Sequence, residues 1–194
     1  IYVHADLYDG FVDRVVDLTK QYQLGNPLDT ATNLGPMVRT SAADFVRGQI
    51  AEAVNAGAKS LVDPNDFAEN KADSPYLAPH VLVDVDHSMR VMTEESFGPV
   101  VGIMKVSSDE EALKLMNDSD LGLTASLWST DEDAVLALGD RVDAGTIFLN
   151  RCDYLDPELA WTGVKNSGRG VSLSAFGYDQ LTQAKSFHYR TKID

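Results

Sequence analysis

The chain has 194 residues, of which 44% are hydrophobic and 24% are charged, an ordinary composition for a globular domain with a real core. Its net charge of -14, uninterrupted by any basic cluster, argues against nucleic acid or an anionic membrane surface as a partner. No apolar stretch is long enough to span a bilayer.

The first half of the chain alternates between strand and helix patterns. Apolar residues recur at helical spacing in two segments, and Asp6 is placed to cap the first. A polar stretch with three prolines is typical of a surface loop at 63–79. We expect strands at 1–4, 58–62 and 81–84, and helices at 8–22 and 41–57. Because a strand already occupies residues 1–4, we expect the natural protein to extend before Ile1.

The central segment joins a polar loop to an apolar strand. Two glutamates, Phe97 and a Gly-Pro turn occupy residues 94–99, and residues 100–106 are almost entirely apolar. Such a run favours a strand buried on both faces, and the turn ends any preceding helix. The loop therefore lies at the entrance of a rigid strand, where binding residues are common, although a solvated acidic corner with a core phenylalanine fits the pattern too.

The second half repeats the alternation. We expect helices at 108–117, from 130 onward and at 172–181, and strands at 123–128, 146–150 and 186–190, with a loop-rich stretch at 151–171. The whole pattern predicts one α/β domain over residues 1–194, with a mostly parallel sheet and flanking helices. Ligands of such sheets bind beyond the carboxyl ends of the strands, where Asn150 falls.

Metal and thiol chemistry find little support in the sequence. The four histidines are scattered and form no ligand pattern, so we predict no metal site. Cys152 is the single cysteine, which excludes an internal disulfide and suits a reducing compartment such as the cytoplasm. It has no obvious base beside it and is either an unreactive packed residue or a nucleophile. The glycine-rich residues 166–170 lack the strand-to-helix setting of a phosphate loop and are typical of a turn.

Residues 94–100, Glu-Glu-Ser-Phe-Gly-Pro-Val, resemble the signature of the aldehyde dehydrogenase superfamily. In that family the second glutamate hydrogen-bonds the nicotinamide-side ribose of NAD or NADP, and the phenylalanine packs by the nicotinamide ring. The resemblance therefore implies that Glu95 and Phe97 are cofactor contacts.

Further segments resemble the same family in the same order, from residue 1 to the end of the chain. They are 25–29 with 35–36, 121–125, 144–150 and 162–168. The match adds Leu123 as a contact near the nicotinamide and Asn150 as a residue that shapes the active site. Trp161 stands where the family has an aromatic lining the aldehyde tunnel, although it could equally pack in a core. Trp161-Thr162-Gly163 departs by one glycine from the family's Phe-Gly-Gly, and residues 151–156, with Cys152, are also not generic.

The resemblance implies a reaction whose other parts lie upstream. In the family a cysteine thiolate attacks the aldehyde, hydride passes to NAD(P), and water hydrolyses the thioester. The nucleophilic cysteine, the glutamate that activates water and the oxyanion-hole asparagine all precede the segment that residues 1–4 resemble. We therefore expect the C-terminal part of a catalytic domain, with no catalytic residue of its own and with Asn150, Cys152 and Trp161 as substrate-binding residues.

Two other hypotheses remain open. The chain could be a non-catalytic truncated paralogue that acts as a structural or oligomerisation partner, because residues 183–190 resemble the family's oligomerisation strand. It could also be an unrelated α/β enzyme that uses Cys152. The sequence leaves open which aldehyde is used, and whether NAD or NADP is preferred.

Overall fold

The computed structural model describes residues 1–152 and 154–192, which form two compact units. The first unit runs from Ile1 to Ala112, and the second begins at Leu113. Each unit has its own strands and helices, so the prediction of a single domain over residues 1–194 stays a prediction.

The first unit alternates strands with helices, as its sequence pattern predicts. Its helices are α1 (Ala5–Thr19), α2 (Thr40–Asn55), the short α3 (Arg90–Thr93) and a 3₁₀ turn at Pro64–Asp66. Its strands are β1 (Tyr2–His4), β2 (Lys59–Ser60), β3 (His80–Val83), β4 (Val100–Gly102) and β5 (Met104–Val106). Helix α1 starts earlier than predicted, and His4 rather than Asp6 caps it by accepting a hydrogen bond from the Asp6 backbone nitrogen at 3.3 Å.

The apolar run 100–106 serves two strand pairs rather than one. Its first half, β4, pairs in parallel with β3, and its second half, β5, pairs in parallel with β1. Ile103 lies between the halves, and its side chain is fully buried. The burial predicted for this run is therefore complete at Ile103, where the chain passes from its pairing with β3 to its pairing with β1.

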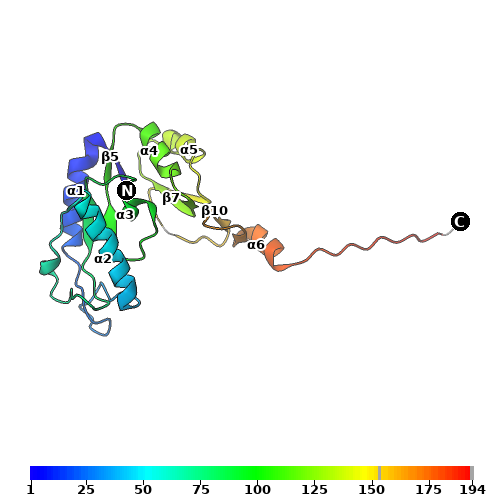
Figure 1. The fold of residues 1–194 in the computed structure, drawn as a ribbon. Helices are drawn as coiled ribbons and strands as arrows, with labels where there is room; N and C mark the ends of the chain where they lie inside the picture. Colours follow the sequence, from blue (N-terminus) through cyan, green and yellow to red (C-terminus); the bar gives the residue numbers. More distant parts are fainter. Residues whose placement is uncertain (153, 193–194) are drawn as a thin grey trace. The chain divides into compact units, whose positions relative to one another are not determined.

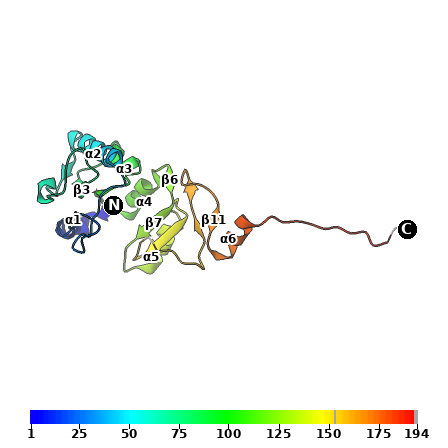
Figure 2. The same ribbon diagram turned by 90° about the horizontal axis from the view of Figure 1, so that it is seen from below.

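Helices cover both faces of strand β3 (Figure 2). Leu82 packs in a cluster with Ala43, Val46 and Ile50 of α2. Val81 and Val83, whose side chains alternate with that of Leu82, belong to a second cluster with Val12 of α1. The first unit therefore has a helix–sheet–helix layering that holds residues 94–99 beside α2.

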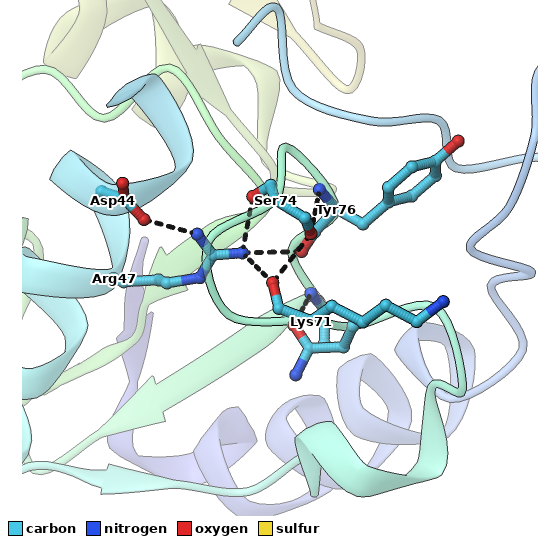
Figure 3. A network of polar contacts seen from close by, with 7 residues as sticks. Asp44, Arg47, Lys71, Ser74 and Tyr76 are labelled. Carbon is cyan, nitrogen blue, oxygen red and sulfur yellow. Dashed lines mark hydrogen bonds and ion pairs between the residues drawn. The ribbon is translucent and has the colours of Figure 1, made fainter. Parts of the chain in front are cut away.

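Arg47 of α2 fixes the long loop before β3 (Figure 3). Its guanidinium forms an ion pair with Asp44 at 2.7 Å. The same group donates to the carbonyl oxygens of Lys71, Ser74 and Tyr76 at 2.8, 3.0 and 2.8 Å. These bonds satisfy carbonyl groups in a loop that has little regular structure of its own.

The second unit is built from short strands and helices. Its helices are α5 (Glu132–Gly139), α6 (Ser174–Leu181) and most of α4 (Asp109–Asn117), which crosses the boundary. Its strands are β6 (Leu121–Gly122), β7 (Thr124–Leu127), β8 (Thr146–Leu149), β9 (Trp161–Thr162), β10 (Val164–Lys165) and β11 (Val171–Ser172). Strands β7 and β8 pair in parallel, whereas β6–β10 and β9–β11 are antiparallel.

The structure confirms the predicted fold class, an α/β protein with parallel strand pairs and flanking helices. Residues 182–192 form neither helix nor strand after α6 (Figure 1), so the terminal strand predicted at 186–190 is wrong for the single chain. The oligomerisation role predicted for residues 183–190 stays a prediction. A β-strand exists only when its backbone groups pair with a neighbouring strand. The apolar pattern around Phe187 and Tyr189 marks a segment suited to pairing, but it supplies no partner.

Candidate functional site

The segment predicted to contact a cofactor lies between α3 and β4. Its backbone is turned by hydrogen bonds from the Gly98 nitrogen to the Ser96 oxygen at 2.9 Å and from Val100 to Gly98 at 2.8 Å. The Pro99 oxygen accepts a hydrogen bond from the His80 nitrogen of β3 at 2.8 Å. The pairing of β4 with β3 thus begins immediately after residues 94–99 and fixes the position of Pro99.

Glu95 and Phe97 both project from this segment into solvent. Glu95 is exposed, and 80% of the surface of Phe97 is accessible. The phenylalanine therefore does not plug the core, which was the alternative interpretation of the sequence. An exposed carboxylate that accepts hydrogen bonds, two residues from an exposed aromatic ring, suits contact with ribose hydroxyls and a planar ring. These two residues fit the cofactor contacts that the family resemblance assigns to them.

Arg90 links the start of the segment to helix α2. Its Nε donates to both carboxylate oxygens of Glu94 at 3.0 Å, and its Nη1 donates to both oxygens of Glu52 at 2.9 Å. The hydrogen bonds to Glu94 and Glu52 raise the pKa of Arg90 above its usual value. The hydrogen bonds from Arg90 are also the main cause of a lowered pKa of Glu94. The guanidinium lies 5.5 Å from the centre of the Phe45 ring of α2.

Ser96 and Gly98 also contact α2. The Ser96 hydroxyl donates to Oε1 of Gln49 at 2.7 Å, and the Gln49 side chain is fully buried. A Cβ added to Gly98 would lie 2.9 Å from Cγ2 of Val46, so a larger residue would force the segment away from the helix. Gly98 therefore permits the close approach of the chain to α2.

In the second unit, Leu123 and Trp161 line one open hollow of about 340 Å³. The rest of its wall comes from the turn at 166–170 and from neighbouring strand and helix residues. These are Thr162, Gly163, Ser167, Gly168, Arg169, Gly170, Val171, Ser172 and Gln180. Leu123 is 41% exposed, and Trp161 is half-buried. Trp161 thus borders an open space, as a residue that lines a tunnel would.

Asn150 follows β8, as predicted, but its side chain forms hydrogen bonds with the backbone of Ser129. Its Nδ2 donates to the Ser129 oxygen at 2.8 Å, and its Oδ1 accepts from the Ser129 nitrogen at 3.0 Å. Its backbone φ of 52° lies in the left-handed region, which asparagine tolerates better than most residues. The predicted substrate contact of Asn150 stays a prediction, and the structure adds a role in joining residue 150 to residue 129.

Cys152 is exposed and does not pack in the core. The Arg151 guanidinium lies 3.9 Å from the centre of the Tyr154 ring, so its charge is directed to an aromatic face. Asp153, in the non-generic run 151–156, lies outside the described residues. The structure therefore gives no separate support to nucleophilic chemistry at Cys152, and its role in substrate binding stays a prediction.

Several residues with organising roles were missed by the sequence analysis. Arg90 precedes Glu94 by four residues, a spacing that favours ion pairs on a helix and was available as a signal. Gln49 follows Val46 on the packing face of α2, where a polar side chain is unusual. Lys165 donates to the Asn117 and Ser119 oxygens at 2.8 and 2.9 Å, contacts between distant positions that no local pattern reveals.

Two kinds of site find no support in the part of the chain that the structure describes. Within residues 1–152 and 154–192, no three histidine, cysteine, aspartate or glutamate side chains gather as metal ligands would. Among the helices of these same residues, none has the length and apolar character needed to cross a membrane.

Comparison with known proteins shows the family. The model of the aldehyde dehydrogenase family matches residues 1–187, so this chain belongs to that family. Among curated proteins, it is 34% identical over 186 residues to an NADP(+) succinate-semialdehyde dehydrogenase of Mycolicibacterium paratuberculosis, covering 95% of this chain and 38% of that relative.

Solved structures of the family resemble the chain in fold as well. Succinic semialdehyde dehydrogenase from Streptococcus pyogenes, in complex with NADP+, superposes with a TM-score of 0.83 at 30% identity, over 91% of this chain and 38% of that chain. Betaine aldehyde dehydrogenase from Staphylococcus aureus, in complex with NAD+, gives a TM-score of 0.83 at 30% identity, over 93% and 36%. The chain thus spans less than two fifths of the length of these relatives.

Proposed function

We propose that this chain is the C-terminal part of the catalytic domain of an NAD(P)-dependent aldehyde dehydrogenase, which oxidises an aldehyde to a carboxylate. The observation that carries the proposal is the exposed pair Glu95 and Phe97, held immediately before β4 in the family's own motif. NAD and NADP both occur with the relatives, so either is a reasonable cofactor.

The residues of this chain would bind and orient the cofactor and would not take part in the covalent steps of the reaction. The Glu95 carboxylate would accept hydrogen bonds from ribose hydroxyls, and Phe97 would present its ring to the nicotinamide. Leu123 is the third residue that the family resemblance assigns to the cofactor, as an apolar contact. The bound nicotinamide would supply the hydride acceptor, and its alignment is the contribution that we assign to this chain.

Substrate selection would fall to the second unit. Trp161 borders an open hollow and would line the path of the aldehyde. Asn150 and Cys152, close in sequence on the loop after β8, would contribute to the same path. The aldehydes of the relatives, succinate semialdehyde and betaine aldehyde, are the first substrates to test.

Cys152 is the only cysteine and does not stand in the family's nucleophile position, so we expect no turnover by the isolated 194-residue chain. The full-length protein should oxidise one of the two aldehydes with NAD or NADP, followed by absorbance at 340 nm. Glu95→Gln and Phe97→Ala should lower kcat/KM on the order of tenfold, since each removes one contact that aligns the cofactor. Glu69→Gln and Tyr22→Ala, which alter a carboxylate and an aromatic ring of the same unit, serve as matched controls. Unchanged activity in both site variants, or no activity in the wild type, would refute the proposal.

We further propose that the protein forms a homo-oligomer through residues 183–190. These residues are exposed and carry Phe187 and Tyr189, whose rings stack 6.1 Å apart. A partner strand would bury these rings and pair the backbone. Phe187→Asp together with Tyr189→Asp should lower the mass measured by light scattering, whereas Lys192→Ala should not. This surface also suits the second candidate function, a non-catalytic partner subunit, which an inactive but oligomeric full-length protein would favour.

The single cysteine supports a cytoplasmic location.

A further inference from the structure

Residues 94–98 present two different faces. Glu94 has extended backbone angles, with φ -105° and ψ 151°, and side chains of an extended segment alternate in direction. Glu94, Ser96 and Gly98 contact α2 directly or through Arg90, whereas Glu95 and Phe97 are exposed. The alternation places the anchoring residues and the candidate binding residues on opposite sides of one short segment.

Helix α2 offers a matching row of three residues. Val46, Gln49 and Glu52 follow one another at intervals of three and therefore share a face of the helix. Val46 faces Gly98, Gln49 accepts the hydrogen bond of Ser96, and Glu52 reaches Glu94 through Arg90. The segment thus runs along α2 in the opposite direction, with contacts at both of its ends and in the middle.

These contacts differ in what they can contribute to stability. Arg90, Glu52 and Glu94 have side-chain exposures of 43%, 53% and 45%, and exposed ion pairs add little to the free energy of unfolding. Two paired carboxylates around one guanidinium nevertheless define the direction of the chain well, because each pairing uses two hydrogen bonds. Removing Arg90 would leave Glu52 and Glu94 as neighbouring negative charges without the cation that both of them bind. The two ion pairs of Arg90 therefore contribute more to the position of residues 94–98 than to the stability of the fold.

We infer that Arg90 is a positioning residue for the cofactor, and that Gln49 and Ser96 share this role. The three residues hold residues 94–98 on α2 and thereby align Glu95 and Phe97 with the nicotinamide riboside. This inference rests on the proposed function. It adds residues that touch neither cofactor nor aldehyde and that act only through the segment they hold.

The test uses the full-length protein with NAD and NADP as cofactors and succinate semialdehyde or betaine aldehyde as substrate. Arg90→Ala should raise the KM for the cofactor and lower kcat, with a fall in kcat/KM on the order of tenfold, at a nearly unchanged urea midpoint. Arg90→Lys, which keeps the charge but loses the paired geometry, should recover part of the loss. Ser96→Ala should act in the same direction but less strongly.

Inhibition by ADP separates local positioning from general damage. ADP lacks the nicotinamide riboside, so its inhibition constant should stay the same in Arg90→Ala while the KM for the full cofactor rises. Arg47→Ala is the matched control, because Arg47 is also a guanidinium bound to several groups, but it holds residues 71–76 instead. It should lower the urea midpoint without a selective effect on the nicotinamide end.

The outcomes are distinguishable. An active wild type whose Arg90→Ala variant keeps normal kcat and KM, or weakens ADP and cofactor equally, overturns the positioning role and leaves the proposed function standing. A wild type that neither oxidises an aldehyde nor binds NAD or NADP overturns both.

Discussion

The segment before β4 and the segment after β8 both carry predicted site residues, but they are held in opposite ways. In the first, Glu94 and Ser96 make the structural contacts, and Glu95 and Phe97 stay exposed. In the second, Asn150 itself bonds the backbone of Ser129 through both ends of its amide. In the first segment, support and the predicted cofactor contacts belong to different side chains, whereas in the second, support and the predicted substrate contact both belong to Asn150. We therefore expect mutations in the first segment to change either stability or activity, and mutation of Asn150 in the second segment to change both.

The largest effect should come from the core beneath the first segment. Leu82→Ala removes a fully buried side chain from the cluster that joins β3 to α2. We expect a loss of about 2–5 kcal/mol in the free energy of unfolding, measured by urea denaturation. Leu28→Ala, at a position that is 92% exposed, should change it by less than about 0.5 kcal/mol. Equal losses at the two positions would contradict the placement of α2 on β3.

A backbone contact should be the corresponding weak point of the second unit. A Cβ added to Gly145, the residue before β8, would meet the carbonyl oxygen of Thr162 in β9 at an impossibly short distance, so these two residues would have to move apart. We expect Gly145→Ala to lower the free energy of unfolding by about 1–3 kcal/mol. Gly10→Ala in α1 meets no atom within 4 Å and should instead add about 0.5–1 kcal/mol. Amide hydrogen exchange should show faster exchange in the second unit of Gly145→Ala, and protection equal to wild type would contradict the contact.

Asn150 tests the combined role directly. Asn150→Ala loses two hydrogen bonds and places a Cβ-bearing residue without local polar support at φ 52°, so we expect a loss of about 1–2 kcal/mol. Asn150→Gly removes the backbone strain and should recover part of that stability by thermal unfolding. If Asn150 also binds substrate, Asn150→Gly should recover stability without recovering kcat/KM. Recovery of both would leave Asn150 with a structural role alone.

Local patterns were sufficient to predict the main elements of the fold. The helices α2 and α4 and the strands β1 and β3 lie within one or two residues of their predicted bounds, because apolar spacing and glycine stops are local signals. Gly57, with φ 115°, ends the α2 region as expected. The split at Ile103 was not predictable, since it depends on which strands lie on either side of the run.

The candidate site was only partly predictable for the same reason. The family motif indicated Glu95 and Phe97, and the structure shows both exposed. The contacts that hold them join residues 38 and 47 positions apart, Arg90 with Glu52 and Ser96 with Gln49. No periodic pattern carries information over such separations. The two-residue strands around Trp161 and Val164 were missed because their pairing, rather than their composition, defines them.

The smallest expected effect is a pH dependence at the edge of the first segment. His80 begins β3, its Nδ1 lies 2.9 Å from the Ser60 hydroxyl, and burial lowers its pKa below the usual value of 6.5. Between the lowered folded pKa and 6.5 the unfolded chain binds the proton more readily, so stability should fall as the pH drops through this window. Urea midpoints measured from pH 7 down to about pH 5 stay above the range in which carboxylates such as Glu94 titrate. His80→Gln should flatten this slope, and an equally steep slope in the variant would show that another group causes it.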